Sequence, residues 1–335
     1  PPLLPPAGIR IFVLGRGRAV GKIAIIGAGA VGATLAYTLT LKGIVSEFAL
    51  VDTNREKAEA EVLDITHAMP LGHSVKAYAS GYEACADAAI VVVTAGAKQR
   101  PGETRVELLG RNAAIARGIV ESVYGSGFSG VLLMISNPVD ALTYVAHRVA
   151  VEGFGAPPQK VIGSGTVLDS ARFREFLAGH CDVNPGNIHG YVLGEHGDSS
   201  FPAWSLTTIG GVGIDRFCAE CGGACETGSL LEEAQASVRQ AAEAIIAAKG
   251  ATYYGIAQAA SVIVQAILRN ERRILPVSTV RLGYRGIGRT AFSFPTIVGA
   301  GGAEKVLDFP LSEEDERKLL ASARYVAGVI EGAGL

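Results

Sequence analysis

The 335-residue sequence has little net charge, few aromatic side chains and no long apolar run. Its 30 basic and 32 acidic side chains leave a formal charge of −2, so no charge excess indicates a nucleic-acid partner or a membrane surface. No apolar run reaches the roughly 18 residues that a membrane helix needs. The five cysteines are an odd number in a large chain, which favours reduced thiols in a cytoplasmic protein.

The first 21 residues form a segment of their own, which begins Pro-Pro-Leu-Leu-Pro-Pro. A secretory signal is not expected, because the apolar stretch is short and no small-residue cleavage site follows it. Three interpretations stay open for this segment: a disordered extension, an artificial addition, or an arm that packs on a partner subunit.

Apolar runs alternate with helical patterns in the next part of the chain. Strands are predicted at residues 22–26, 47–51, 88–94 and 130–135, and helices at 31–42, 55–67 and 104–123. This alternation predicts a parallel sheet with right-handed crossovers. The pattern changes near residue 165, which we interpret as a domain boundary.

The second part of the chain mixes helices and strands less regularly. Helices are predicted at residues 167–180, 231–249, 256–269 and 312–330, a strand at 188–193, and an antiparallel pair at 274–282 and 291–298. Ser312 and Asp315 are expected to cap the last helix as a pair.

A glycine-rich segment at residues 27–32 (GAGAVG) follows the first strand and opens the first helix. Gly27 permits the tight turn, Gly29 lets a pyrophosphate approach the backbone, and Gly32 allows close packing of helix on strand. Asp52 lies twenty residues beyond Gly32, at the end of the second strand. There a carboxylate accepts hydrogen bonds from a ribose and repels a 2′-phosphate, so the pattern favours NAD over NADP.

Small residues at positions 95–97 (AGA) end the strand at 88–94. Ligands bind at the carboxyl ends of strands in doubly wound sheets, and small residues there let a cofactor lie close to the backbone. An ordinary exit from a strand into a loop explains the same residues equally well.

Six motifs, in order, resemble those of the bacterial-type L-lactate dehydrogenase family, whose sister family is malate dehydrogenase. They lie at residues 27–32 (GAGAVG), 95–105 (AGAKQRPGETR), 136–140 (SNPVD), 163–172 (GSGTVLDSAR), 194–198 (GEHGD) and 249–252 (KGAT). The resemblance implies an α/β fold, in which a Rossmann-type doubly wound parallel sheet at residues 22–165 is followed by an α+β catalytic domain at 166–335.

The resemblance also implies an NAD-dependent oxidation of L-lactate to pyruvate, and the reverse. His196 would transfer the proton, since the unperturbed pKa of histidine lies near neutral pH. Asp169 would fix the tautomer of the imidazole, and the planar fork of Arg172 would hold the substrate carboxylate. Arg105, in a loop that closes over the substrate in the family, would polarise the reacting carbonyl.

Further residues receive roles only through the resemblance. The substrate-binding set is completed by Gln99, Asn137, Asp140 and Thr252, and the cofactor-binding set by Val31, Lys57, Tyr82, Gly96, Ala97, Ser136 and Asn137. For Lys57 and Tyr82 an ordinary surface side chain is an alternative.

Gln99 is the residue that separates the two sister families. Malate dehydrogenases carry an arginine at this position to pair the second carboxylate of oxaloacetate, whereas a neutral glutamine would leave that charge buried and unpaired. Arg100 could take the arginine's part if the loop shifted by one residue, but the spacing from Gln99 to Arg105 matches the lactate family without a gap. Malate dehydrogenase, or another 2-hydroxy-acid dehydrogenase, is the alternative function; an NAD-binding protein without turnover is a third.

Arg174 and His189 match the positions at which bacterial lactate dehydrogenases bind fructose 1,6-bisphosphate. The resemblance therefore implies activation by this effector and a homo-oligomer, expected to be a tetramer. An interface or surface salt bridge is the plainer interpretation of the same two residues.

Cys218, Cys221 and Cys225 raise the question of a zinc site. Thiolate metal sites usually need four ligands, and no fourth cysteine or histidine is close in sequence. We predict no metal.

Overall fold

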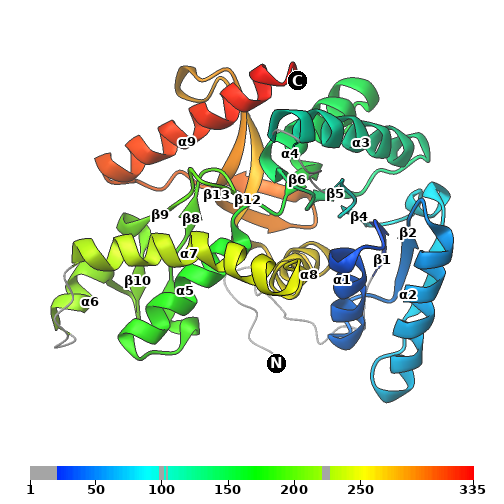
Figure 1. Ribbon diagram of the computed structural model, residues 1–335, viewed down its shortest axis with the longest axis horizontal. Coiled ribbons are helices and arrows are strands. Elements are labelled where there is room, and N and C mark those ends of the chain that lie inside the picture. Colours follow the sequence, from blue (N-terminus) through cyan, green and yellow to red (C-terminus); the bar gives the residue numbers. More distant parts are fainter. Residues whose placement is uncertain (1–20, 98–101, 103–104, 221–226) are drawn as a thin grey trace, which may run out of the picture.

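The computed structural model describes residues 21–97, 102, 105–220 and 227–335. Six parallel strands form the first part of its main sheet, in the order β3-β2-β1-β4-β5-β6, as in doubly wound dinucleotide-binding sheets (Figure 1). Their bounds are β1 Lys22–Ile26, β2 Glu47–Val51, β3 Lys76–Ser80, β4 Ile90–Val93, β5 Val131–Met134 and β6 Val161–Gly163. The Rossmann-type parallel sheet is thereby confirmed.

Four helices connect these strands: α1 Ala30–Leu41, α2 Arg55–Ala68, α3 Arg105–Gly125 and α4 Val139–Arg148. Strands β1, β4 and β5 are almost wholly buried, which is why they appear in the sequence as continuous apolar runs. Three elements of this half were not predicted, namely β3, α4 and β6. Strand β3 is only half-buried, and its sequence contains no continuous apolar run from which a strand would be predicted.

The sheet does not stop where the sequence pattern changes. Strand β12 (Arg273–Leu282) pairs antiparallel with β6, and β13 (Arg289–Gly299) and β14 (Gly302–Val306) extend the sheet to nine strands. The predicted antiparallel pair is confirmed as β12 and β13. At the seam, a Cβ on Gly163 would lie 2.3 Å from Oγ1 of Thr143 and 3.0 Å from Cβ of Ser278, so the two halves pack closely.

The remaining elements surround this extension. The helices are α5 Val167–Cys181, α6 Ile214–Glu220, α7 Thr227–Lys249, α8 Tyr254–Leu268 and α9 Glu313–Gly332. The short strands are β7 Ile188–His189, β8 Val192–Leu193, β9 Phe201–Pro202, β10 Thr208–Ile209 and β11 Val212–Gly213. Figure 1 shows α9 beside β13 and α8 beside α1. The α+β character of this half is as predicted.

The prediction of one strand at residues 188–193 was wrong. The segment divides into β7, which pairs with β10, and β8, which pairs with β9. The two short strands are separated at Gly190, where a Cβ would lie 2.9 Å from the ring of Phe173. The backbone passes close to a buried aromatic at this point, and the chain turns from one small sheet to the other.

The predicted cap of α9 is half right. The side chain of Ser312 accepts a hydrogen bond from the backbone N–H of Asp315 at 3.2 Å. The Asp315 carboxylate does not return to Ser312; it accepts from the backbone N–H and the hydroxyl of Ser205. A tertiary contact therefore replaces the second half of the capping box.

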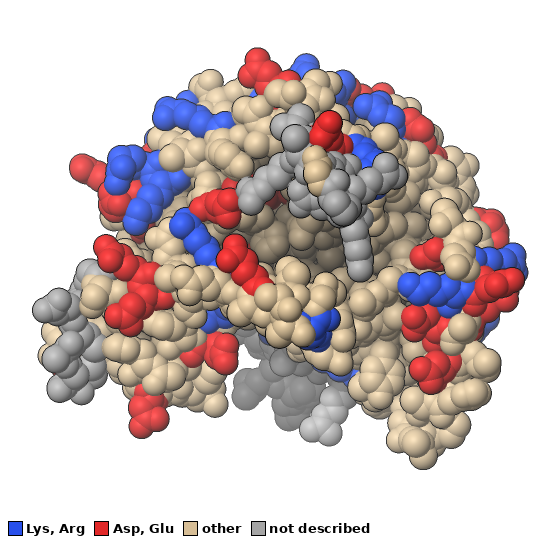
Figure 2. Space-filling view, in the orientation of Figure 1, with Lys and Arg blue, Asp and Glu red and all other residues tan. Residues whose placement is uncertain are grey.

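The surface bears both signs of charge, intermixed on the face shown in Figure 2, and this face is hollowed near its centre. Within the described ranges, no helix combines the length and apolar character needed to cross a bilayer.

Candidate active site

His196 and Asp169 meet across two distant segments of the second half. His196 follows β8, and Asp169 lies in the first turn of α5. An oxygen of the Asp169 carboxylate lies 2.6 Å from Nδ1 of the imidazole. Since an ionised carboxylate only accepts hydrogen bonds, this contact places a proton on Nδ1 and leaves Nε2 to exchange a proton with a substrate.

The pair is largely withdrawn from water, with 7% of the Asp169 side chain and 27% of the His196 side chain exposed. Burial alone would lower the pKa of His196, but the Asp169 carboxylate outweighs it and raises the pKa well above the ordinary value. Burial would raise the pKa of Asp169, but His196 and Arg172 hold it below its usual range. The imidazole therefore favours its protonated form.

Arg172 lies one helical turn beyond Asp169 on α5. Its Nη1 donates to the second oxygen of the Asp169 carboxylate at 3.1 Å, and its side chain is 14% exposed. One nitrogen of the planar fork is used in this way, which leaves further N–H donors for a carboxylate ligand. The imidazole of His196 and the guanidinium of Arg172 thus share one buried acid.

The glycine-rich turn forms at the carboxyl end of β1. Gly27 has a φ of +110° and sits where a Cβ would lie 2.8 Å from the backbone N of Ala95. A Cβ on Gly32 would lie 1.9 Å from the carbonyl oxygen of Gly27, whereas a Cβ on Gly29 would meet nothing within 4 Å. Close packing at Gly32 and open space at Gly29 are the two features that a pyrophosphate site needs.

Asp52 lies at the end of β2 beside this turn. One of its carboxylate oxygens accepts from the backbone N–H of Ala28 at 2.7 Å, and the other from the backbone N–H of Asn54 at 2.8 Å. The carboxylate is thus fixed at the position where an adenosine ribose would lie.

A cavity of about 530 Å³ opens over these strand ends. Seven residues of the predicted cofactor set line it, namely Gly27, Gly29, Asp52, Lys57, Tyr82, Gly96 and Ala97. Val31, Gly32, Ser136 and Asn137 are not among the lining residues. The open backbone at Gly29 and the fixed acid at Asp52 fit a dinucleotide.

Comparison with known proteins decides the family. Residues 21–163 match a family model described as the lactate/malate dehydrogenase NAD binding domain, and residues 166–333 match the alpha/beta C-terminal domain of the same family. The chain belongs to the lactate/malate dehydrogenase family. NAD is accordingly the cofactor of this family member, in agreement with the prediction.

Similar proteins in this family come from several bacteria. The chain is 46% identical to an L-lactate dehydrogenase of Thermoanaerobacter sp. (strain X514) over 312 residues. The aligned region covers 93% of this chain and 99% of the relative. It is 47% identical to an L-lactate dehydrogenase of Treponema denticola, over 90% of this chain and 95% of the relative.

The solved structures agree with the sequences. The ligand-bound minor L-lactate dehydrogenase of Enterococcus mundtii is 39% identical and superposes with a TM-score of 0.88, covering 94% of this chain and 98% of that one. A lactate dehydrogenase from a Medee basin deep-sea metagenome library is 37% identical, with a TM-score of 0.89, and covers 95% and 100%.

Asn112 is a site residue that the sequence reasoning missed. It is buried on α3, where its side chain accepts from the backbone N–H of Ala97 at 2.8 Å and donates to the carbonyl of Asn137 at 3.1 Å. It therefore connects the loop after β4, which lines the cavity at Ala97, to the loop after β5. An amide on the apolar face of a helix, three residues after Leu109, was the available signal.

Asp140, predicted to bind the substrate, makes contacts within the protein that the sequence did not indicate. Its side chain is buried, and both carboxylate oxygens are taken by groups of the protein, the backbone N–H of His196 and the hydroxyl of Ser278. The protein thus supplies one hydrogen bond to each oxygen of this carboxylate, and a substrate-binding role for Asp140 stays a prediction.

Other predicted residues occupy separate places. Thr252 is half-buried in the connection between α7 and α8. Asn137 is exposed directly after β5, and Ser136 is buried with its hydroxyl donating to the carbonyl of Ala95 at 2.5 Å. Arg174 lies on α5 and is half-buried, and His189 is exposed on β7.

Several predictions fall outside the part of the chain that the structure describes. These are Gln99, the side chain of Arg105, the segment 1–20, and two of the three cysteines considered for zinc, Cys221 and Cys225. Among the described residues, no cluster of three or more His, Cys, Asp or Glu side chains could hold a metal ion.

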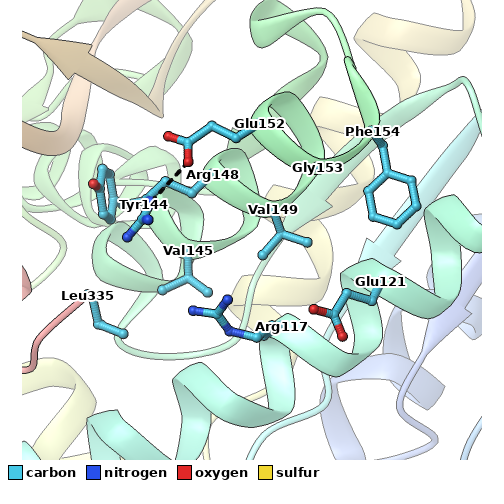
Figure 3. Close-up of a pocket in the computed structure, with 10 residues that line it drawn as sticks. All are labelled: Arg117, Glu121, Tyr144, Val145, Arg148, Val149, Glu152, Gly153, Phe154 and Leu335. Atoms are coloured by element: carbon cyan, nitrogen blue, oxygen red, sulfur yellow. Dashed lines mark ion pairs between the residues drawn. The ribbon is translucent and has the colours of Figure 1, made fainter.

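A second cavity, of about 500 Å³, lies apart from these residues (Figure 3). It is formed by α3, α4 and the turn after α4, and Arg117, Val145 and Leu335 are among its lining residues. Arg148 and Glu152 form an ion pair at its edge, at 3.5 Å. It contains no residue of the predicted catalytic, substrate or cofactor sets.

Proposed function

We propose that this protein is an L-lactate dehydrogenase that reduces pyruvate with NADH and catalyses the reverse reaction. The observation that carries the proposal is the buried set of His196, Asp169 and Arg172, which combines a proton donor with a carboxylate anchor. The L-lactate dehydrogenases that resemble the chain at 43–47% identity support the same reaction.

Each residue of this set has one task in the reaction. Arg172 pairs with the substrate carboxylate through the donors that Asp169 leaves unused. The protonated imidazole of His196 gives the Nε2 proton to the carbonyl oxygen of pyruvate as it becomes a hydroxyl, and Asp169 stabilises the charge on the ring. Bound NADH supplies the hydride. In lactate oxidation the neutral ring takes the hydroxyl proton.

The roles of the substrate loop rest on the sequence. We assign to Arg105 the polarisation of the reacting carbonyl and to Gln99 the choice between pyruvate and oxaloacetate, as the family resemblance implies. A neutral side chain at position 99 accepts pyruvate and leaves the second carboxylate of oxaloacetate unpaired, at a cost of several kcal/mol.

NADH oxidation with pyruvate and with oxaloacetate tests this function. We expect kcat/KM to favour pyruvate by about a hundredfold or more, which corresponds to about 3 kcal/mol. Gln99→Arg should shift the ratio towards oxaloacetate, and Gln99→Asn, which is also neutral, should not. Equal or faster turnover of oxaloacetate by the unchanged protein contradicts the proposal.

We also propose that fructose 1,6-bisphosphate activates the enzyme at Arg174 and His189. Burial lowers the pKa of the Arg174 guanidinium, and the nearby positive charge of Arg273 acts in the same direction. Among the described residues no carboxylate forms an ion pair with Arg174. A partly buried cation next to a second cation is stabilised by a bound phosphate.

The effector acts at a subunit interface in this proposal, in a tetramer. Large apolar side chains exposed on α1, α2 and α8, among them Leu41, Leu63 and Tyr254, support burial against further subunits. Pyruvate KM should fall severalfold when the bisphosphate is added, and Arg174→Gln should abolish the change. Arg324→Gln on α9 is the control. An unchanged KM in the wild-type protein would count against activation.

A further inference from the structure

The Asp140 carboxylate joins three segments of the chain. It lies in the first turn of α4, three residues after Asn137. One oxygen accepts from the backbone N–H of His196 at 2.7 Å, and the other accepts from the hydroxyl of Ser278, on β12, at 2.5 Å. The parallel-sheet half, the histidine segment and the antiparallel extension are thus connected through one side chain.

This carboxylate is placed where a charge is expensive. Asp140 is 3% exposed and Ser278 is fully buried. Burial raises the pKa of Asp140 to about 6, against the effect of the two hydrogen bonds from Ser278 and His196. The group is therefore mainly ionised at neutral pH. A buried charge of this kind is held in place only by partners that satisfy it.

The other side of the histidine segment is held independently. The hydroxyl of Ser322, on α9, accepts from the backbone N–H of Glu195 at 2.8 Å, and the Glu195 carboxylate accepts from the hydroxyl of Ser199. Asp140 therefore fixes one residue of the segment, His196, rather than the segment as a whole.

We infer that Asp140 is a positioning residue of the proton-transfer step: it fixes the backbone of His196 against the cofactor half and adds a second negative charge behind the imidazole. This inference rests on the proposed function. It assigns to Asp140 a part different from substrate binding, since Asp140 acts only through His196.

The charges around the ring set the sign of the effect. The imidazole faces Asp169 and Arg172 from α5 and Asp140 from α4, with Glu195 next to it in the chain. Asp169 and Asp140 raise the pKa of His196, and Arg172 and burial lower it. Loss of the Asp140 charge must therefore make the imidazolium easier to deprotonate.

Asp140→Asn is the decisive variant, because the amide keeps the size of the side chain and an oxygen that accepts from His196. We expect the imidazole pKa of His196 to fall by about one unit. The pH at which pyruvate reduction begins to decline should fall by the same amount. NADH binding should stay unchanged. The measurements are kcat/KM against pH, and NMR titration of the histidine resonances, with His196 assigned by its loss in His196→Gln.

Two further variants separate positioning from charge. Asp140→Ala removes the hydrogen-bond acceptor as well as the charge, and we expect kcat to fall about a hundredfold. Asp140→Asn keeps the acceptor, so most of the wild-type kcat should remain. Ser278→Ala keeps the Asp140 carboxylate and removes one of its hydrogen bonds, and we expect a smaller fall in kcat than in Asp140→Ala. Ser293→Ala is the matched control, because Ser293 is a buried serine on β13 opposite Ser278 and donates nothing to Asp140.

The outcomes are distinct. If the pKa of His196 and the pH dependence of kcat/KM are the same in Asp140→Asn as in the wild-type protein, the inference is overturned. If Asp140→Ala does not fold, the Asn and Ser278→Ala variants still decide. If the wild-type protein does not reduce pyruvate, the proposed function fails, and the NMR titration still tests the link between Asp140 and His196.

Discussion

The two halves of the site are built from different parts of the chain's chemistry. The cofactor cavity lies over the ends of β1, β2 and β4, where glycine and alanine residues lie beside larger side chains such as Tyr82 and Ile119. The proton-transfer site consists of charged side chains that converge from α4, α5 and the segment after β8. The cofactor half depends on glycines that lack a Cβ, as at Gly29 and Gly32. The proton-transfer site depends on how its buried charges are paired.

This difference implies that the two halves can be disabled separately. The residues of the proton-transfer set do not line the cofactor cavity. A substitution in one half should therefore alter catalysis or NADH binding, and not both.

His196→Gln should cause the largest effect, and it should be confined to one half. We expect kcat for pyruvate reduction to fall by about 10³- to 10⁴-fold, since general acid catalysis is lost. The affinity for NADH, measured by fluorescence titration, should stay within about twofold. His67→Gln, an exposed histidine on α2, is the control. Retained pyruvate reduction in His196→Gln would remove the basis of the proposed mechanism.

The pH dependence should sharpen the same contrast. Pyruvate reduction needs the imidazolium, so kcat/KM should be level at neutral pH and fall about tenfold per unit above the pKa of His196, which its two carboxylate neighbours raise to about 9. Lactate oxidation needs the neutral ring and should rise over the same range. NADH affinity should follow neither curve. Parallel curves for the two directions would contradict the assignment of His196.

Asp52→Asn should have the smallest effect, and on the opposite half. The amide keeps an oxygen for the backbone N–H of Ala28 but loses the charge that repels a 2′-phosphate. We expect NADH to bind about tenfold more weakly, or about 1.4 kcal/mol, and discrimination against NADPH to narrow. Pyruvate KM at saturating NADH should not change. Asp64→Asn, exposed on α2, is the control, and a raised pyruvate KM would show that the halves are coupled.

The same difference explains what the sequence could predict. The glycine turn, Asp52 and strands β1, β2, β4 and β5 follow from local patterns, because each feature needs only a few neighbouring residues. The strand predicted at 188–193 is divided at Gly190, which passes close to the ring of Phe173, and no pattern within the segment shows this contact. The contacts of Asp140 within the protein were not predicted, for a similar reason. Its contacts with His196 and Ser278 span 56 and 138 residues, and no local pattern encodes them.

The seam at Gly163 has a mechanical consequence. A single sheet runs through both halves, and the halves pack closely around β6. Swinging the halves apart would break the pairing of β6 with β12, so we expect movement during turnover in loops and helix ends. A chain that ended after β6 would expose β6 as an edge strand, and exposed edge strands promote aggregation through strand pairing.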